Sequence, residues 1–224
     1  MKIAIITLHL LLFLAGIARG EKKPFAIDGT APELKEGEML VLTNRVEGVD
    51  TLGRAPIANG TFHIEGMIEE PCVALLKVAD KEGGFVFLLD SDAPYEMELL
   101  NQKPSVIKGG KLQEELNAYQ KVVAQANEKM AAIRQEIDQA SAQRRFKTVS
   151  ELREKLEKEN SKARSRLDAI LERNGDNLFS VYIRTAGMEQ MPLPVLKELY
   201  ASLSEEARHW EQARLVEARI AALE

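Results

Sequence analysis

Cys72 is the only thiol of the 224-residue chain, and it opens the apolar segment "CVALLKV" (72–78). A reactive thiol needs a nearby cation or a helix N-terminus to lower its pKa, whereas Glu69 and Glu70 just before it would raise that pKa. A single cysteine can form neither a Cys-x-x-Cys exchange motif nor an internal disulfide. Free cysteine is among the most often buried residue types. We therefore predict that Cys72 is a buried, structural residue of a β-strand.

Metal ligands are equally sparse. Beyond the first 20 residues the chain has two histidines, His63 and His209, which lie far apart. A zinc site normally needs three or four ligands with close pairs among them. The segment "LLDSDAPYE" offers Asp90, Asp92 and Glu96 as conceivable calcium ligands, but it lacks the spacing and the glycine of an EF-hand loop. We predict an acidic turn there, and neither a metal nor a cofactor.

Catalytic motifs are absent from the sequence. It contains no Gly-x-Ser-x-Gly, P-loop or dinucleotide-binding glycine pattern. Most acidic residues alternate with lysines and arginines in helical segments, as on solvated faces. We predict no catalytic residue and a protein that is not an enzyme. The alternative is a hidden enzyme, either a carboxylate-dependent hydrolase or a single-cysteine thiol or peroxide reaction through Cys72.

The first 20 residues, "MKIAIITLHLLLFLAGIARG", have the features of a secretory signal peptide. Lys2 precedes an uncharged apolar stretch at 3–17, and Ala18 and Gly20 provide the small residues that signal peptidase accepts. A spanning helix needs about 20 apolar residues, so a membrane anchor is the weaker interpretation. No cysteine follows Gly20, so no lipoprotein anchor is expected. We predict cleavage after Gly20 and a periplasmic or secreted protein.

Removal of this segment takes away two bases, Lys2 and Arg19, and leaves 28 bases against 35 acids. Such an acidic chain binds phosphate backbones poorly, which argues against nucleic acid as a partner.

Residues 21–109 have the pattern of a β-sandwich. Short segments in which apolar and polar residues alternate are separated by turn signals such as Asn59-Gly60, at a spacing of roughly 8–12 residues. In "TFHIEG" the alternation places Phe62 and Ile64 on one face and His63 on the other. The expected strands are Phe25 with Ile27, 38–44, 61–66, 72–78, 84–90, 95–99 and 105–107. We predict an antiparallel sandwich of about seven strands.

Residues 110–174 change to a helical period. Apolar residues recur at four-three spacing along Leu112, Leu116, Tyr119, Val123, Ala126, Met130, Ile133, Ile137 and Ala140. The phase breaks near Phe146, Thr148-x-x-Glu151 has the form of a capping box, and Asn174-Gly175 forms a helix end. We predict a long helical hairpin. One kinked helix through 144–149 remains the alternative, because the link contains neither glycine nor proline.

Residues 175–224 form a C-terminal helical segment with three shorter helices, expected at 177–186, 192–203 and 204–223. Ser204 is placed to cap the last one. Its apolar stripe continues to the end of the sequence and offers a surface on which a partner could dock. The fold class we predict is α+β: an N-terminal antiparallel β-sandwich, then a long α-helical hairpin and short C-terminal helices.

Four segments together resemble a known family: "FAIDGTAPELKEGEMLVL", "NGTFHIEGMIEEPCVALL", "FVFLLDSDAPYEMEL" and "VIKGGKLQEELNAY". They are similar to the N-terminal domain of unknown function (DUF4369-type) of secreted thioredoxin-like proteins of the Bacteroidetes. The stretch from Asn177 to Leu223 is similar to the helical linker of these proteins. In that family an AhpC/TSA-type thiol–disulfide oxidoreductase domain follows, with a Cys-x-x-Cys. This sequence ends at Glu224, and Cys72 matches neither redox cysteine, so the resemblance implies an accessory module without the thioredoxin domain.

We therefore expect a non-catalytic, secreted or periplasmic accessory or binding module that acts as an adaptor. The expected partner is an envelope protein such as a thioredoxin-fold protein, or a second copy of the chain. In the latter case residues 112–140 would pair between chains as a coiled coil, which would make the protein a self-assembling structural one.

Overall fold

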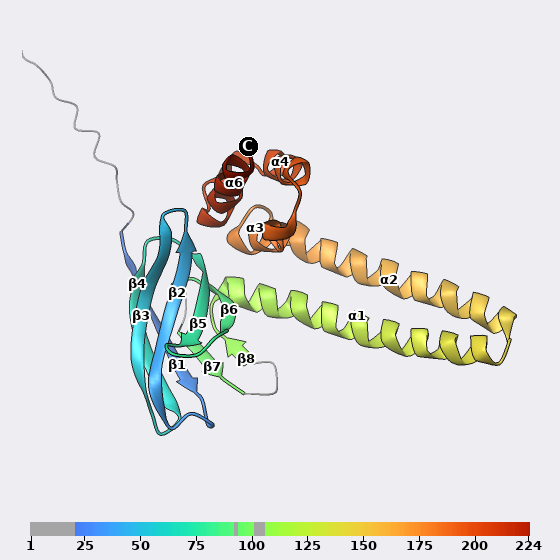
Figure 1. Cartoon of the computed structure of the whole chain (residues 1–224), viewed down its shortest axis with the longest axis horizontal. Helices are drawn as coiled ribbons and strands as arrows, with labels where there is room; N and C mark the ends of the chain where they lie inside the picture. Colours follow the sequence, from blue (N-terminus) through green and yellow to red (C-terminus); the bar gives the residue numbers. More distant parts are fainter. Residues whose placement is uncertain (1–20, 92–93, 101–105) are drawn as a thin grey trace, which may run out of the picture.

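A computed structural model describes residues 21–91, 94–100 and 106–224. The predicted signal peptide (1–20) and Asp92 lie outside the described residues. Figure 1 shows a β-structure at one end of the molecule, a long helical hairpin that projects from it, and shorter helices packed beside both. This arrangement confirms the predicted fold class.

Eight strands form one sheet in the order β6-β5-β2-β3-β4-β1-β7-β8. The strands are β1 (Lys23–Thr30), β2 (Glu36–Arg45), β3 (Gly48–Ala58), β4 (Thr61–Ile68), β5 (Cys72–Val78), β6 (Phe85–Leu89), β7 (Tyr95–Glu98) and β8 (Val106–Lys108). The sheet folds over so that strands from both of its halves surround one apolar core. Every neighbouring pair is antiparallel except β1 and β7, which run parallel. The expectation of a purely antiparallel sandwich is wrong for that pair.

Strand β3 is the one that the sequence pattern did not predict. It contains Gly53 and Pro56, which are both uncommon inside strands. Its pairing with β2 shifts register between Val41 and Leu42. Gly53 is required by close packing, since a Cβ there would lie 2.7 Å from the side chain of Ile64. Gly53, which makes the strand hard to recognise in the sequence, is thus the residue that lets it pack against β4.

Helices α1 (Lys111–Ala142) and α2 (Phe146–Asn174) form the predicted hairpin, which excludes the single kinked helix. The chain turns at Arg144, whose φ is +55°. Helix α2 begins at Phe146 with Arg145 at the N-cap and no side-chain cap, so the capping box expected at Thr148 is wrong by three residues. The predicted seam is confirmed at Leu116, Ile133 and Ala140, which are buried.

The C-terminal segment contains α3 (Leu178–Thr185), a 3₁₀ turn η1 (Met188–Gln190), α4 (Leu193–Ser202), α5 (Glu205–Arg208) and α6 (Glu211–Leu223). Ser204 accepts a hydrogen bond from the Ala207 amide at 3.0 Å, as a helix cap does. The prediction of a single helix over 204–223 is wrong, because the helix is interrupted at Trp210. Its backbone is extended and its indole N–H donates to the Asp176 carbonyl at 3.0 Å, which anchors this corner to the loop before α3.

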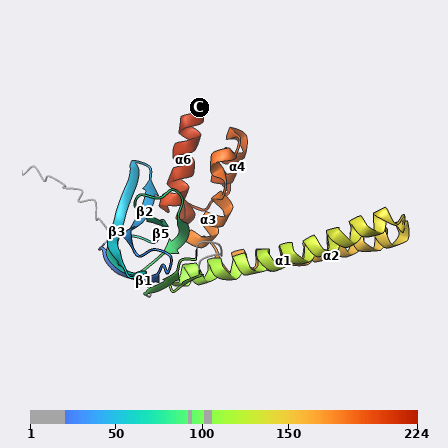
Figure 2. The same cartoon turned by 60° about the horizontal axis from the view of Figure 1, so that its bottom comes forward.

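Helix α6 lies against β2 and β5 (Figure 2). Glu211 accepts a hydrogen bond from the Val46 amide at 2.8 Å, and Arg214 pairs with Glu70 at 2.9 Å. The C-terminal helices are therefore attached to the sandwich as well as to the hairpin. Across the described ranges, every helix is too short or too polar to cross a bilayer.

Candidate functional site

Cys72 is the first residue of β5 and has 5% of its surface exposed. Burial raises the pKa of its thiol to about 11, and this effect outweighs the lowering by the Thr43 hydroxyl and by Arg45. A thiol with such a pKa remains protonated at neutral pH and is a poor nucleophile. The predicted burial of Cys72 in a β-strand is confirmed.

Asp90 caps a helix. Helix α1 begins after Gly110, which has no side chain to cap it, and the carboxylate of Asp90 accepts the Leu112 amide at 3.2 Å instead. The Tyr95 hydroxyl beside it donates to the Leu88 carbonyl and accepts the Asp90 amide, both at 2.9 Å. A negative charge at a helix N-terminus is stabilising. Asp90 is therefore part of the joint between the sandwich and α1.

Two amide side chains complete this joint, and sequence reasoning missed both. Gln113 is buried on α1 and its Oε1 accepts the Leu88 amide of β6 at 2.9 Å. Asn117, one turn later, receives a hydrogen bond from Gln113 and donates to the Ile107 carbonyl of β8 at 2.7 Å. Strands β6 and β8 are the two edges of the sheet. Helix α1 thus covers the seam between the edges and satisfies one backbone group on each.

The other sequence candidates do not come together. Glu96 is exposed on β7, whereas Asp90 is buried beside α1. His63 lies on the sandwich and His209 lies between α5 and α6. Within residues 21–91, 94–100 and 106–224 no group of three His, Cys, Asp or Glu side chains is arranged to hold a metal ion.

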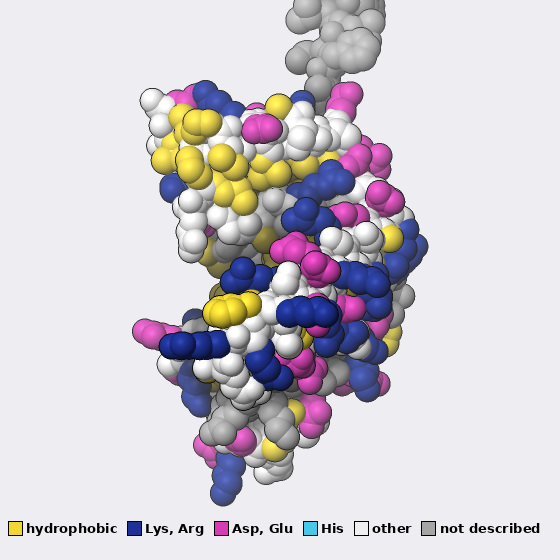
Figure 3. All heavy atoms as spheres, turned by 90° about the vertical axis from the view of Figure 1, so that its right-hand side faces the viewer, with side chains coloured by type: hydrophobic (Ala, Val, Ile, Leu, Met, Phe, Trp, Pro, Cys, Tyr) yellow, Lys and Arg dark blue, Asp and Glu magenta, His cyan; other side chains and the backbone are white. Residues whose placement is uncertain are grey.

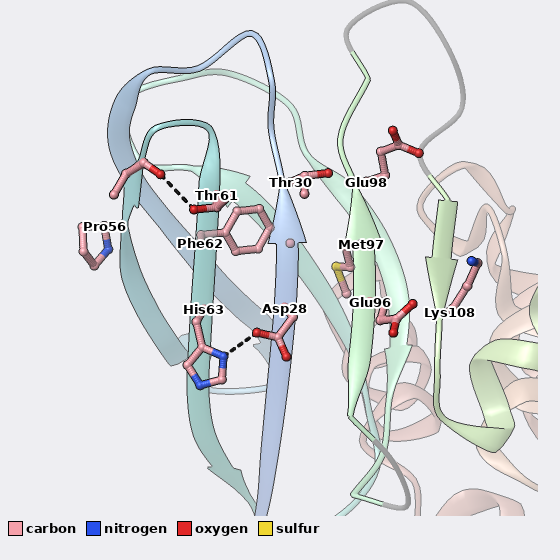
Figure 4. Close-up of a pocket in the computed structure, with 12 residues that line it drawn as sticks. Asp28, Thr30, Pro56, Thr61, Phe62, His63, Glu96, Met97, Glu98 and Lys108 are labelled. Carbon is pink, nitrogen blue, oxygen red and sulfur yellow. Dashed lines mark hydrogen bonds and ion pairs between the residues drawn. The ribbon is translucent and has the colours of Figure 1, made fainter.

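A depression of about 980 Å³ lies on the outer face of β3, β4, β1, β7 and β8 (Figure 4). Its floor includes Gly29 and the core residues Phe62 and Met97, which are almost fully buried, together with the exposed apolar residues Pro56 and Ala58. Gly29 is required for this floor, since a Cβ there would lie 1.9 Å from the Phe62 ring. The alternation of the strands turns their polar side chains outward around the floor, so the depression has an apolar base and a polar rim.

The rim contains an aspartate–histidine pair. His63 Nδ1 lies 2.7 Å from Asp28 Oδ1, and His63 Nε2 lies 3.4 Å from Glu65. The hydrogen bonds from His63 to Asp28 and then to Glu65 raise the pKa of the imidazole above its ordinary value. Figure 4 shows the imidazole and the Asp28 carboxylate pointing toward each other across β4 and β1. The position of His63 on the polar face of its strand is confirmed.

The rest of the rim is acidic. Asp28 and Glu96 are register partners on β1 and β7, and Thr30 and Glu98 are the next pair. Lys108 on β8 is the cation opposite Glu96 in the register, yet neither Glu96 nor Glu98 forms an ion pair within 4.0 Å among the described residues. Carboxylates on adjacent strands repel one another, and a cationic group between them would relieve that repulsion.

This arrangement can bind a charged group. The Thr61 hydroxyl of the rim donates to the Ala58 carbonyl at 2.9 Å. The hydrogen bonds to Asp28 and Glu65 favour the charged form of the imidazole, so they raise its pKa. The depression can accept a partly apolar group that carries positive charge. The sequence pattern placed His63 and Glu65 on the same face of their strand. It did not place them near β7, because that proximity depends on the parallel pairing of β1 with β7.

Comparison with known proteins gives one result for the N-terminal half. No curated protein matches the chain. Residues 25–116 match the family described as a domain of unknown function, DUF4369. The match runs past the last strand to Leu116, so it includes Gly110 and Gln113 at the start of α1. The segment that is similar to the DUF4369 domain therefore contains most of the sandwich and the first turns of α1 that close its seam.

Proposed function

We propose that this protein is a non-catalytic binding module that works in the periplasm or outside the cell, and that the depression on the outer sheet face contacts its partner. The observation that carries the proposal is the depression itself. Its volume of about 980 Å³ is in the range of ligand sites, and its apolar floor and acidic rim fit a basic, partly apolar segment of another protein.

The fate of the chemically capable residues supports a non-catalytic role. Cys72 is buried and its thiol pKa is raised, Asp90 caps α1, and Tyr95 bonds to the backbone of β6. Each of these groups contributes to the stability of the fold. The N-terminal segment of 20 residues supports export, because it has the charge, length and small residues of a signal peptide.

The partner we propose is a thioredoxin-fold protein of the same envelope. Support comes from the resemblance of the sequence to modules that precede thioredoxin-like domains. Self-assembly through residues 112–140 has less support, since Ile133 and Ala140 of that seam are buried within the hairpin. A coiled coil between chains would require α1 to exchange α2 for a second copy of itself.

Site-specific photo-crosslinking in the source cell tests the proposal. A photoreactive phenylalanine analogue would replace Thr30 on the rim, with Glu157 on the exposed face of α2 as the matched control position. We expect a crosslinked partner from position 30 alone, and at least a fivefold loss of that product in the Glu96→Gln/Glu98→Gln variant. Mass spectrometry then identifies the partner.

Four outcomes would contradict parts of the proposal. Crosslinks from position 157 but not from position 30 would move the binding site away from the depression. A partner without a thioredoxin fold would keep the binding role and reject the adaptor role. Redox turnover by the purified protein that disappears in Cys72→Ser would reject the non-catalytic role, and an uncleaved chain in the cytoplasm would reject export.

A further inference from the structure

The end of the hairpin has a charge opposite to that of the whole chain. Residues 139–150, which form the last turn of α1, the link and the first turn of α2, contain Arg144, Arg145 and Lys147 and no acidic residue. The complete chain carries a net charge of −5. Helix α1 is 32 residues long, so this tip lies about 45 Å from the sandwich. Figures 1 and 2 show it as the part of the molecule that projects farthest from the body.

Phe146 lies at the centre of this basic tip. It is 74% exposed, more than any other large hydrophobic side chain in the described part of the chain. The hairpin end is closed without it, because Ala140 and Val149 are the buried residues there. A single exposed apolar residue needs no explanation by itself. Here, however, the exposed ring lies between cations at the apex of a rod.

The cations of the tip are available to bind. Among the described residues neither Arg144 nor Arg145 has an acidic partner within 4.0 Å, and the contact of Lys147 with Glu151 is 4.0 Å long between two exposed side chains. Figure 3 views this side of the molecule and shows blue Lys and Arg side chains, with magenta Asp and Glu side chains among them, over the projecting hairpin. Closer to the body the pairing is tighter, as between Arg173 and Glu115 at 3.1 Å.

We propose that this tip, defined as residues 143–149, binds the surface of a membrane that contains anionic lipids. Phe146 enters the boundary between headgroups and acyl chains, and Arg144, Arg145 and Lys147 contact lipid phosphates. Aromatic and basic side chains together are the composition of interfacial anchors, and arginine can bind a phosphate through two hydrogen bonds.

The shape of the tip favours a lipid surface over an acidic protein. A stable protein interface buries roughly 800 Å² on each partner, which the convex end of two helices cannot supply without a matching cavity. A fluid bilayer deforms around a small convex end and needs no such cavity. Attraction to an anionic leaflet contributes about fivefold in affinity for each basic residue close to the surface. Three cations and one ring therefore give weak, reversible binding.

Vesicle co-flotation tests this proposal. The protein would be residues 21–224, which contain every element of the described fold, so that the apolar N-terminal segment does not itself insert. The probes are vesicles of pure phosphatidylcholine and vesicles with about one third phosphatidylglycerol, at low and high salt. We expect flotation with the anionic vesicles only, weakened by salt. Arg144→Gln/Arg145→Gln should lower the partition coefficient about 25-fold, and Phe146→Ser should lower it about tenfold.

The matched control is Arg164→Gln/Arg166→Gln, which removes the same charge from exposed positions of α2 nearer the body. We expect this control to change partitioning by less than twofold. Equal losses in the two double variants would show that only net charge matters and would overturn the proposal. Absence of flotation with anionic vesicles would also overturn it. Binding of the tip to an acidic protein, with no vesicle binding, would assign the tip to a protein partner instead. Thermal unfolding of each variant checks that these exposed substitutions leave the fold intact.

Discussion

The two halves of the α1–α2 hairpin are held in different ways. Near the sandwich, polar and apolar contacts are combined: Asp90 caps α1, Gln113 and Asn117 bond to the two sheet edges, and Leu116 packs in the same apolar cluster as Leu88. In the distal half, from about residue 125 to residue 165, the buried residues are Ile133, Ala140 and Val149. One half belongs to a globular core and the other is a two-helix rod.

This difference indicates that the two halves of the hairpin have different structural roles. The proximal half must be rigid because it closes the seam between β6 and β8. The distal half needs only enough stability to hold its tip away from the body. One buried residue for every one or two helical turns is sufficient for that. If this division is correct, substitutions in the proximal half should unfold the whole protein, and equivalent substitutions in the distal half should loosen the rod alone.

The largest effect is expected for Gly110→Ala. Gly110 has a φ of +70°, and a Cβ there would lie 2.0 Å from the Tyr95 hydroxyl oxygen, so the substitution adds backbone strain to a steric clash. We expect a loss of about 3 kcal/mol in the free energy of unfolding, measured by urea denaturation. Gly175→Ala is the matched control, because Gly175 also has a positive φ but nothing lies within 4 Å of its would-be Cβ. It should cost about 1 kcal/mol. Equal losses would show that the Tyr95 contact is unimportant.

The second prediction compares two buried apolar residues on the same helix. Leu116→Ala should destabilise the whole protein by about 3 kcal/mol, because it opens a cavity between α1 and β6. Ile133→Ala should lower the global stability by less than about 1 kcal/mol, because the rod can open without the sandwich. Hydrogen exchange should instead become faster for amides of residues 125–165 only. A single cooperative transition that shifts equally in both variants would contradict the division between the halves.

Much of this comparison could be predicted from sequence, because helices and strands depend on local periodicity. The seam residues Leu116, Ile133 and Ala140 follow from four-three spacing, and burial of Cys72 follows from its apolar strand. Periodicity fails where a residue is chosen for a partner distant in the chain. Gly53 and Pro56 concealed β3, and the indole of Trp210 broke a helix whose stripe continued through it.

The functional residues show the same limit. The role of Asp90 as a cap depends on α1, which begins 21 residues later, so the local sequence around Asp90 could not indicate it. Gln113 gave no signal, because a polar residue beside a heptad seam is expected to be solvated. The acidic depression could not be predicted either, since it brings Asp28 of β1 beside Glu96 of β7 through a parallel pairing that the sequence pattern did not indicate.

The third prediction removes the buried amide of the joint. Gln113→Leu leaves the Leu88 amide of β6 without its acceptor in a buried position, which costs about 2 kcal/mol. Gln139→Leu, on the exposed surface of the distal half, should change stability by less than about 0.5 kcal/mol. Both values are measured by urea denaturation at neutral pH. An unchanged free energy of unfolding in Gln113→Leu would show that water or a shift of Asn117 replaces the lost hydrogen bond. It would also show that α1 closes the seam through apolar contacts alone.

The smallest effect concerns ion pairs in the two halves. Burial acts to raise the pKa of Glu115, but hydrogen bonds from Arg173 and Asn174 outweigh it and hold that pKa below its ordinary value. A carboxyl whose pKa is lowered by folding stabilises the protein above its unfolded pKa, and this contribution is lost as the pH falls through the folded value. Glu115→Gln should therefore cost about 0.5 kcal/mol at pH 7 and progressively less below pH 4.5.

The distal pair of Glu159 and Lys129, 3.8 Å apart, supplies the control for that measurement. Glu159→Gln should have almost no effect on global stability at any pH, because exposed pairs contribute little and the rod opens independently of the sandwich. The observable is the difference in unfolding free energy from the unsubstituted protein, followed between pH 7 and pH 3. The same pH dependence in both variants would contradict this expectation. The Glu115–Arg173 ion pair would then contribute no more to global stability than the Glu159–Lys129 pair. In that case the boundary between the two halves of the hairpin would lie closer to the sandwich than Glu115.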